Sequence, residues 1–517
     1  MQICRPLLIC LLIGAMGSGI VKADDYYWVG GTGNWSDFSN HWVKTSGGAS
    51  FHIAAPGALD DVYFDANSFS AGGQTVTVDV TTTNCRNLDW TGATNTPDFA
   101  TSSTSNNLHV YGSFTLIPAM TFNFNGNIYF DATTTGHTIT CANHSMPGSY
   151  KYIYFNGAGG GWTLQDSLDA PLIYFELVAG ALNTNNQNLN IMNFSSSNSN
   201  VRSLILGSST MKVFGWSWYS YNTTNFTFDA GTSTIIYDYP SGQLTFTGGL
   251  DFHRSVFLEN TKINNSSNTF DSLLFSPGRT YTLEANRTQT INNYLGANGS
   301  CSSSITIVSD APGTQATFSK ASGAVTIDYA SLKDIAATGG ATFTANNTID
   351  LSNNSGWTIN SPTPRSLYWV GNTGNWTDPA HWALSSGGAG GNCVPNPGDD
   401  VYFDANSFSA GGQTVTVDVS TAVCNDMIWT GATNTPDFAT SSTSNSLKIY
   451  GSLTLVPAMT FNFNGDLYFE ATTTGQTLTF ANHTMPGSYK YIYFQGAGGG
   501  WTLQDSLDAP LIYFELV

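Results

Sequence analysis

Short apolar segments separated by Gly, Asn, Ser and Thr run along the whole chain. Several of them alternate apolar and polar residues, as residues 76–80 do, and a period of two is typical of a β-strand with one buried face. A spacing of roughly 20 to 31 residues separates similar segments, which suits one coil of a β-solenoid that buries its apolar face against the next. Members of this series are Ile128, Ile153, Ile173, Leu204 and Ile235.

The pattern predicts an all-β protein built of β-solenoid units in tandem. Tandem β-sandwiches are the alternative, although they would place strands every 8 to 12 residues or so. Composition agrees with an all-β fold, because the chain holds 53 Gly, 31 Phe, 24 Tyr and 13 Trp, which favour strands and turns over helices. Only 10% of residues are charged, while the 41% that are hydrophobic are ample for a core.

The chain repeats itself with a unit of about 340 residues. Residues 60–80 recur unchanged as 399–419, and residues 145–178 return almost unchanged as 484–517. Self-similarity at a fixed period is the sequence signature of a repeat architecture. We therefore divide the chain into an export signal (1–23), a first unit (24–360), a short Ser/Pro/Thr linker (361–365) and a second, truncated unit (366–517).

The first 23 residues have the features of an export signal. Arg5 precedes an apolar run, and small residues lead to Ala23 immediately before Asp24, which matches a charged start, an apolar centre and a cleavage site. No later stretch approaches the ~20 apolar residues of a transmembrane helix. The sequence predicts a protein that is secreted or held at the cell surface, without a transmembrane segment.

Charge limits the partners of the exported protein. Loss of Arg5 and Lys22 with the signal leaves 14 Lys and Arg residues against 35 Asp and Glu residues, a net charge of −21. A nucleic-acid ligand needs clustered cations to replace the counterions of its phosphates, and no run of Lys or Arg occurs. We expect no nucleic-acid partner, and we expect extracellular glycans or the surfaces of host or neighbouring cells instead.

Three segments carry a resemblance to a known group of proteins. The opening residues 28–37, the following 60–69 and the closing 325–357 resemble the repeat unit of large exported surface proteins of gliding bacteria. The likeness covers the starts of both units and the end of the first one. The middle of the unit shares only the general pattern of short apolar segments separated by Gly, Asn, Ser and Thr. The resemblance implies right-handed parallel β-helices and an adhesin or extracellular-matrix role.

Catalytic and cofactor-binding motifs are missing from the sequence. His137 becomes Gln476 in the second unit, and residues 157–161, though rich in Gly, lack the Lys-Ser/Thr of a phosphate-binding loop. We therefore expect a turn at 157–161, no catalytic or cofactor-binding residue, and a protein that is not an enzyme. The alternatives are an array of carbohydrate-binding modules, or a polysaccharide lyase or hydrolase built on a β-helix.

One dense acidic group precedes a strand in each unit. In the first unit it consists of Asp60, Asp61 and Asp65 together with Asn67. Such oxygens are the ligands that calcium prefers, so this group is a candidate calcium site. The alternative is a solvated turn before the strand.

The aromatic segment 214–221 is a candidate glycan-binding site. On a regular strand Trp216 and Trp218 would share one face, and Tyr219 and Tyr221 would share the other. Flat aromatic rings of this kind can stack on sugar rings, although one face could equally belong to the core.

Five cysteines follow the export signal: Cys85, Cys141, Cys301, Cys393 and Cys424. Exported proteins meet an oxidising environment, which favours disulfides. Cys85 aligns with Cys424, whereas Cys393 is opposite Ala54 of the first unit. We predict a disulfide between Cys393 and Cys424, with Cys85 free or paired with Cys141. The alternative is that all five are small buried apolar residues without bonds.

Overall fold

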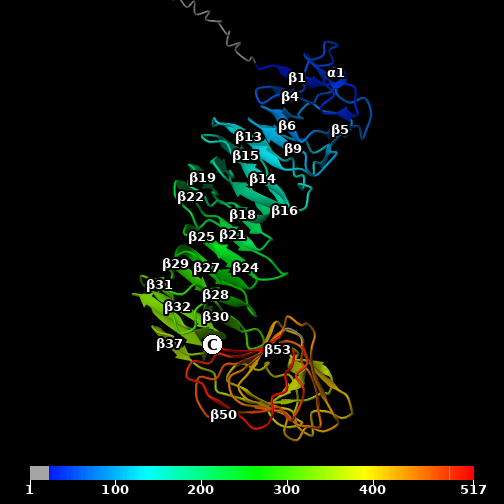
Figure 1. Cartoon of the computed structure of the whole chain (residues 1–517). Coiled ribbons are helices and arrows are strands. Elements are labelled where there is room, and N and C mark those ends of the chain that lie inside the picture. The colour runs from blue at the N-terminus through cyan, green and yellow to red at the C-terminus, as the bar shows by residue number, and fades with distance from the viewer. Residues whose placement is uncertain (1–22, 488–489) are drawn as a thin grey trace, which may run out of the picture.

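The chain is a β-solenoid repeat protein of about 20 stacked coils, as the computed structural model shows for residues 23–487 and 490–517. The first unit forms an elongated column, with its blue N-terminal coils at the top of Figure 1 and its yellow-green last coils at the lower left. The predicted export signal, 1–23, lies outside the described residues except for Ala23. The predicted β-solenoid is confirmed.

Strands of successive coils pair in parallel, with similar residues side by side. Leu108 pairs with Ile128, Ile128 with Ile153, and Ile153 with Phe175. Among the strand pairs of the described residues, only the two at the starts of the units are antiparallel. Parallel pairing between coils excludes the alternative of tandem sandwiches, whose sheets are antiparallel.

The spacing of the sequence segments gave the coil length but not the correct neighbours. Ile173 pairs with Lys151 rather than with Ile153, and Leu204 pairs with Leu182 on another sheet. Every side of a coil carries the same apolar alternation, because every side contributes to one interior. The period alone therefore does not say which side a segment occupies.

Two sheets cover the opening coils of the first unit. One has the order β22 (Phe226–Asp229), β19 (Arg202–Ile205), β17 (Gly180–Asn183), β15 (Gly161–Leu164), β13 (His137–Thr140), β10 (Phe114–Thr115), β7 (Leu88–Asp89), β4 (Asp61–Tyr63), β1 (Asp25–Trp28) and β3 (Trp42–Val43). The other has the order β11 (Thr121–Asn123), β8 (Asp98–Thr101), β5 (Thr75–Val78) and β2 (Gly33–Asn34).

A third sheet, here called the long sheet, runs the whole length of the first unit. It consists of β6 (Thr82–Cys85), β9 (Asn107–Val110), β12 (Ile128–Phe130), β14 (Lys151–Phe155), β16 (Leu168–Leu177), β18 (Leu189–Ser195), β20 (Thr210–Val213), β21 (Ser217–Tyr219), β23 (Thr234–Tyr237), β24 (Leu244–Thr247), β25 (Asp251–Phe257), β26 (Thr261–Ile263), β27 (Asn268–Phe275), β28 (Thr280–Leu283), β29 (Thr288–Gly296), β30 (Ile305–Ser309), β31 (Ala316–Lys320), β33 (Ala330–Lys333), β34 (Ile335–Gly339) and β36 (Ile349–Asp350). A small sheet closes the unit with β32 (Ala324–Asp328), β35 (Thr342–Asn346) and β37 (Trp357–Asn360).

The second unit repeats the opening coils of the first with three sheets. The first sheet holds β40 (Trp382–Ala383), β38 (Ser366–Trp369), β41 (Asp400–Tyr402), β44 (Met427–Ile428), β47 (Leu453–Thr454), β50 (Gln476–Thr479) and β52 (Trp501–Leu503). The second holds β39 (Gly374–Asn375), β42 (Thr414–Val417), β45 (Asp437–Thr440) and β48 (Thr460–Asn462). The third, which corresponds to the start of the long sheet, holds β43 (Thr421–Cys424), β46 (Ser446–Ile449), β49 (Asp466–Phe469), β51 (Lys490–Phe494) and β53 (Ile512–Leu516).

Helical structure in the described part of the chain is confined to α1 (Phe38–His41) and the 3-10 turn η1 (Pro379–His381). Among the described residues, no helix is long and apolar enough to cross a membrane.

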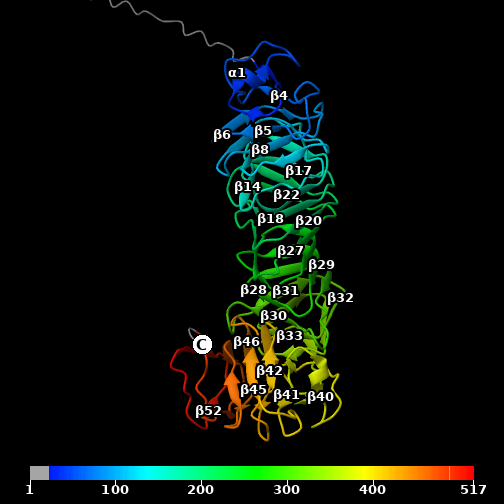
Figure 2. The same ribbon diagram turned by 90° about the vertical axis from the view of Figure 1, so that its right-hand side faces the viewer.

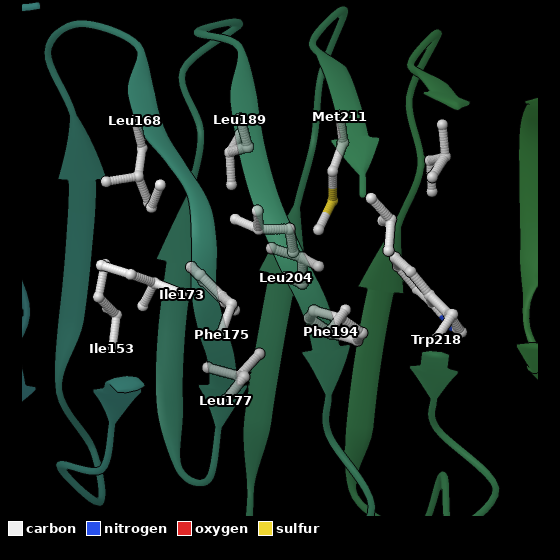
Figure 3. Close-up of a cluster of buried hydrophobic side chains, with 14 of the residues drawn as sticks. Ile153, Leu168, Ile173, Phe175, Leu177, Leu189, Phe194, Leu204, Met211 and Trp218 are labelled. Atoms are coloured by element: carbon white, nitrogen blue, oxygen red, sulfur yellow. The ribbon is translucent and has the colours of Figure 1, made fainter. Parts of the chain in front are cut away.

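The interior of each unit is a stack of apolar side chains contributed by successive coils. Figure 3 shows one stretch, where Leu168, Leu189 and Met211 lie in one row and Phe175, Phe194 and Trp218 contribute to a second. Each coil shields the apolar face of the next from water, which is the main driving force for stacking. The two units have separate cores, one on each side of the linker at 361–365.

Tryptophans close the first coil of each unit. Trp28 pairs with Trp42 across the antiparallel strands β1 and β3, and the Trp35 and Trp42 rings meet edge to face with centroids 4.9 Å apart. Trp376 and Trp382 repeat this contact at 5.0 Å in the second unit. These buried rings cover the open end of the apolar stack in each unit.

Candidate functional site

Two of the four aromatic residues proposed as a glycan site, Trp216 and Trp218, do not share the face that a regular strand would give them. Trp218 is fully buried and stacks on Phe194 with ring centroids 4.2 Å apart, whereas Trp216 is 39% exposed. The prediction that Trp216 and Trp218 point the same way is wrong. Trp216 lies in the bend at 215–216 between β20 and β21, so the alternation of β21 does not extend to it.

Gly215 makes this bend possible. A Cβ at this position would lie 2.3 Å from Oδ1 of Asn193. Asn193 in turn accepts a hydrogen bond from the backbone N–H of Ser217, at 2.9 Å. The close approach fixes the path of the chain and leaves the indole of Trp216 on the outer surface.

Trp216 lies in a shallow groove on the outer face of the long sheet. The groove has a volume of about 310 Å³. Tyr219, also exposed, contributes to it, while Tyr221 packs edge to face against Tyr219 outside the lining. The lining residues are Tyr152, Tyr174, Phe175, Glu176, Asn193, Ser195, Trp216, Ser217 and Tyr219.

A ladder of tyrosines leads to this groove. The rings of Tyr129 and Tyr154 stack with centroids 4.6 Å apart, those of Tyr152 and Tyr154 at 5.0 Å, and those of Tyr152 and Tyr174 at 4.7 Å. Parallel register between coils places equivalent outward side chains directly over one another. The ring faces in the ladder are therefore covered by neighbouring rings, and their edges face the solvent.

Trp216 ends the ladder with a different orientation. Its ring meets Tyr174 at an interplanar angle of 73° and Tyr239 at 67°. Its third ring contact, with Tyr150, is tilted by 31° with centroids 6.5 Å apart. Within the described residues, the indole thus has no parallel stacked partner, and it remains free to receive a flat apolar surface.

The carboxylate of Glu176 gives the groove one negatively charged hydrogen-bond acceptor. It is half-buried, and burial raises the pKa of its carboxyl group. No hydrogen bond or ion pair engages this carboxylate in the part of the chain that the structure describes. Ser195 is its register partner on the next coil, so a hydroxyl lies beside it.

The second unit carries the same ladder. Tyr468 stacks on Tyr493 at 4.6 Å, and Tyr491 stacks on Tyr493 at 5.1 Å and on Tyr513 at 5.0 Å. The sequence holds a trace of the ladder, because Tyr129 and the pair Tyr152–Tyr154 lie one coil length apart, but this spacing alone did not predict it. The missing information was which of the spaced tyrosines point outward on the same sheet.

The acidic group around β4 is engaged by the chain's own donors. Asp60 accepts hydrogen bonds from the backbone N–H groups of Asp24 and Gly57, and Asp61 forms an ion pair with Arg86. Asp65 accepts from the N–H of Asn67 at 2.8 Å.

These side chains therefore do not converge on a common point. Asn67 turns its amide toward Ser46. Across the described residues, no group of three or more His, Cys, Asp or Glu side chains has an arrangement that would hold a metal ion. The geometry does not support the calcium site, and the solvated-turn alternative does not describe Asp61, which is buried within β4.

The predicted disulfide between Cys393 and Cys424 is wrong. Cys393 is bonded to Cys301 of the first unit, with Cα atoms 5.2 Å apart. Cys424 ends β43 at an inward position and is fully buried in the core of the second unit, where it cannot reach the loop that carries Cys393. Cys85 and Cys141 are likewise buried and unbonded, and burial raises the pKa of both thiols.

No protein-family model matches the chain, and searches of curated proteins and of solved structures find no significant match. Function is therefore inferred from the chain's own geometry.

Proposed function

We propose that the chain is an exported, non-enzymatic surface protein of adhesive or matrix type, which binds glycans in the groove around Trp216. The observation that carries this proposal is the combination in one groove of an exposed indole, three phenol groups, a carboxylate and two serine hydroxyls. Sugar rings present an apolar face of C–H groups and a rim of hydroxyls. An aromatic surface beside a few polar groups is complementary to both.

The charge of the groove favours neutral sugars or amino sugars. Glu176 is the one charged residue in the lining, and the chain as a whole has a net charge of −19. A uronic acid would bring a second carboxylate beside Glu176 and meet repulsion. A neutral or cationic sugar would not.

Binding rather than cleavage fits the composition of the lining. Glycoside hydrolysis uses two carboxyl groups about 5 to 10 Å apart, and the lining contains a single carboxyl group and no Lys, Arg or His. The resemblance of the opening and closing segments to adhesin-like surface proteins of gliding bacteria agrees with this proposal. The tyrosine ladder recurs in the second unit.

Titration calorimetry with oligomers of a neutral glucan, chitosan and alginate tests the proposal. We expect binding of one of the first two, no binding of alginate, and a loss of about tenfold or more in affinity for Trp216→Ala. Tyr294→Ala is the matched control, because Tyr294 is 46% exposed and lies outside the groove. Failure of all oligomers to bind, or an equal loss in both variants, would refute the proposed site.

Release of reducing ends or unsaturated sugars from the same oligomers would contradict the non-enzymatic part of the proposal. A loss of this activity in Glu176→Gln would then assign catalysis to the groove.

A further inference from the structure

The second unit packs against the side of the first, near its end. In Figure 1 the coils of the second unit are seen end-on, whereas those of the first are seen from the side, and Figure 2 shows the second unit beside β30 and β33. A cavity of about 570 Å³ lies between the two units. Its lining includes Lys262, Thr306 and Lys333 from the first unit, and Val423 and Lys448 from the second.

The surface used by the first unit is the outer face of the long sheet over its last coils. Lys262 pairs with Thr282, Thr282 with Val308, and Val308 with Lys333, so these outward side chains form one column. The column belongs to the same sheet as the tyrosine ladder, several coils further along the unit.

The surface used by the second unit is its own ladder face. Val423 pairs with Lys448, and Lys448 with Tyr468, in a second outward column. The ammonium group of Lys448 lies 5.0 Å from the centre of the Tyr468 ring. The outward face of the first strands of the sheet that carries the ladder does not contact the other unit in the first unit. In the second unit the same face is a contact surface.

Glu470 joins the two columns. Its carboxylate accepts from Lys333 of the first unit and from Lys448 of the second, each at 2.9 Å, and its side chain is 3% exposed. The disulfide between Cys301 and Cys393 links the same two units covalently.

The two units differ at the positions that make this contact, although long stretches of them are identical. Cys393, Val423, Lys448 and Glu470, here called the clasp set, correspond to Ala54, Asn84, His109 and Asp131 in the first unit. Another difference outside the set, Gln495 in place of Asn156, also lines the cavity between the units.

The residues of the first unit do not suit the same contact. His109 stacks on Tyr129 with centroids 4.2 Å apart, and its Nδ1 lies 2.6 Å from Oδ2 of Asp131. That carboxylate is therefore used within its own unit. Asp131 is also one methylene shorter than Glu470, and Ala54 has no thiol to offer.

We propose that the outer face of the long sheet over Lys262 to Lys333 is a docking surface for the opening coils of a following unit, and that the clasp set selects them. Glu470 supplies the reach to Lys333, Val423 supplies an apolar contact where Asn84 would have to lose its water, and Cys393 locks the pair. The opening of the first unit lacks this set. The surface therefore accepts the second unit of its own chain and does not recruit the first unit of another copy.

Small-angle scattering of the full chain tests this proposal. The variant Cys393→Ala, Val423→Asn, Lys448→His and Glu470→Asp gives the second unit the residues of the first. We expect a larger maximum dimension, because the undocked units are joined only by the linker, and at least about tenfold faster trypsin cleavage after Arg365 in that linker. Circular dichroism should retain the β-signal of the wild type.

The mirror-image variant is the control. Asn84→Val, His109→Lys and Asp131→Glu place residues of the clasp set on the first unit, away from the contact, and should leave the scattering curve and the cleavage rate unchanged. If the fourfold variant does not fold, Cys393→Ala with Glu470→Asp makes the same test with two small changes.

A variant that lacks the disulfide and the clasp residues yet scatters like the wild type would overturn the proposal. Dimers of the wild type in sedimentation velocity that disappear in Lys333→Ala would also overturn it, because they would show that the surface accepts another copy.

Discussion

Arg202 shows how a single buried charge is accommodated without an ion pair. Its side chain is 1% exposed, and its guanidinium donates to the hydroxyl and carbonyl oxygens of Ser196 and to the carbonyl oxygens of Asn200, Asn222 and Thr224. Burial lowers the pKa of this group. The five donors of the planar guanidinium match five neutral acceptors, which compensates for the loss of water.

Replacing Arg202 with Lys should therefore destabilise the protein although the charge is retained. An ammonium group has three donors on a flexible stem and leaves some of the buried acceptors unpaired, at a cost of about 2 to 4 kcal/mol. The midpoint of urea unfolding measures the change. Arg254→Lys is the control, because the described part of the chain gives the Arg254 side chain no hydrogen bond or ion pair, and equal midpoints for the two variants would contradict this account.

At the scale of the element, the turn between β14 and β15 depends on close contact between coils. The Gly-rich segment 157–161 forms this turn, as expected, with a hydrogen bond from the N–H of Gly160 to the carbonyl of Gly157. A Cβ on Gly157 would lie 1.8 Å from the carbonyl oxygen of Ala132 on the preceding coil. The second unit repeats this approach between Gly496 and Ala471.

Gly157→Ala should consequently cost more than the usual loss of a turn glycine. Because the neighbour is backbone, the coils must move apart to accept the methyl group, and we expect a destabilisation of about 3 kcal/mol. Gly73→Asn is the control: Gly73 has positive φ but open space around its Cβ position, and Asn tolerates that conformation, so the expected cost is about 1 kcal/mol or less. Thermal unfolding followed by circular dichroism compares the two, and a cost for Gly157→Ala no larger than that of the control would refute the steric argument.

At the scale of the whole molecule, the contact between units depends on the ionisation of Glu470. Burial opposes ionisation, but Lys448 and Lys333 outweigh it and hold the pKa of Glu470 below its ordinary value of 4.5. A carboxyl group with a lowered pKa stabilises the docked state fully above its ordinary pKa, and this contribution is lost as pH falls through the lowered value.

We expect the units to separate more readily as the pH falls below about 4.5. The maximum dimension from small-angle scattering, measured between neutral pH and about pH 3 in the presence of a reductant, should rise across this range. Other carboxyl groups also titrate there, so the informative quantity is the difference from Glu470→Gln, which removes this titration. The same pH dependence in both proteins would show that Glu470 does not control docking.

The sequence by itself determined the fold class and the repeat. Alternating apolar residues at coil-length spacing have few solutions other than a stacked β-solenoid, because each strand has one face to bury and only the next coil to bury it against. The recurrence of residues 60–80 at 399–419 fixed the repeat in the same way. These conclusions could be drawn from the sequence because they depend on the spacing of apolar residues and on the recurrence of whole segments, both of which can be read along the chain.

Only the tertiary structure decided which residues meet. Trp216 and Trp218 point in different directions because Trp216 lies in the bend before β21 and Trp218 lies within the strand, and Cys393 bonds to Cys301 because the second unit packs against the side of the first. The tyrosine ladder and the contacts of Glu470 likewise depend on register between coils and on docking between units. These are properties of residues 20 to 140 or so positions apart, and periodicity within a strand carries no information about them.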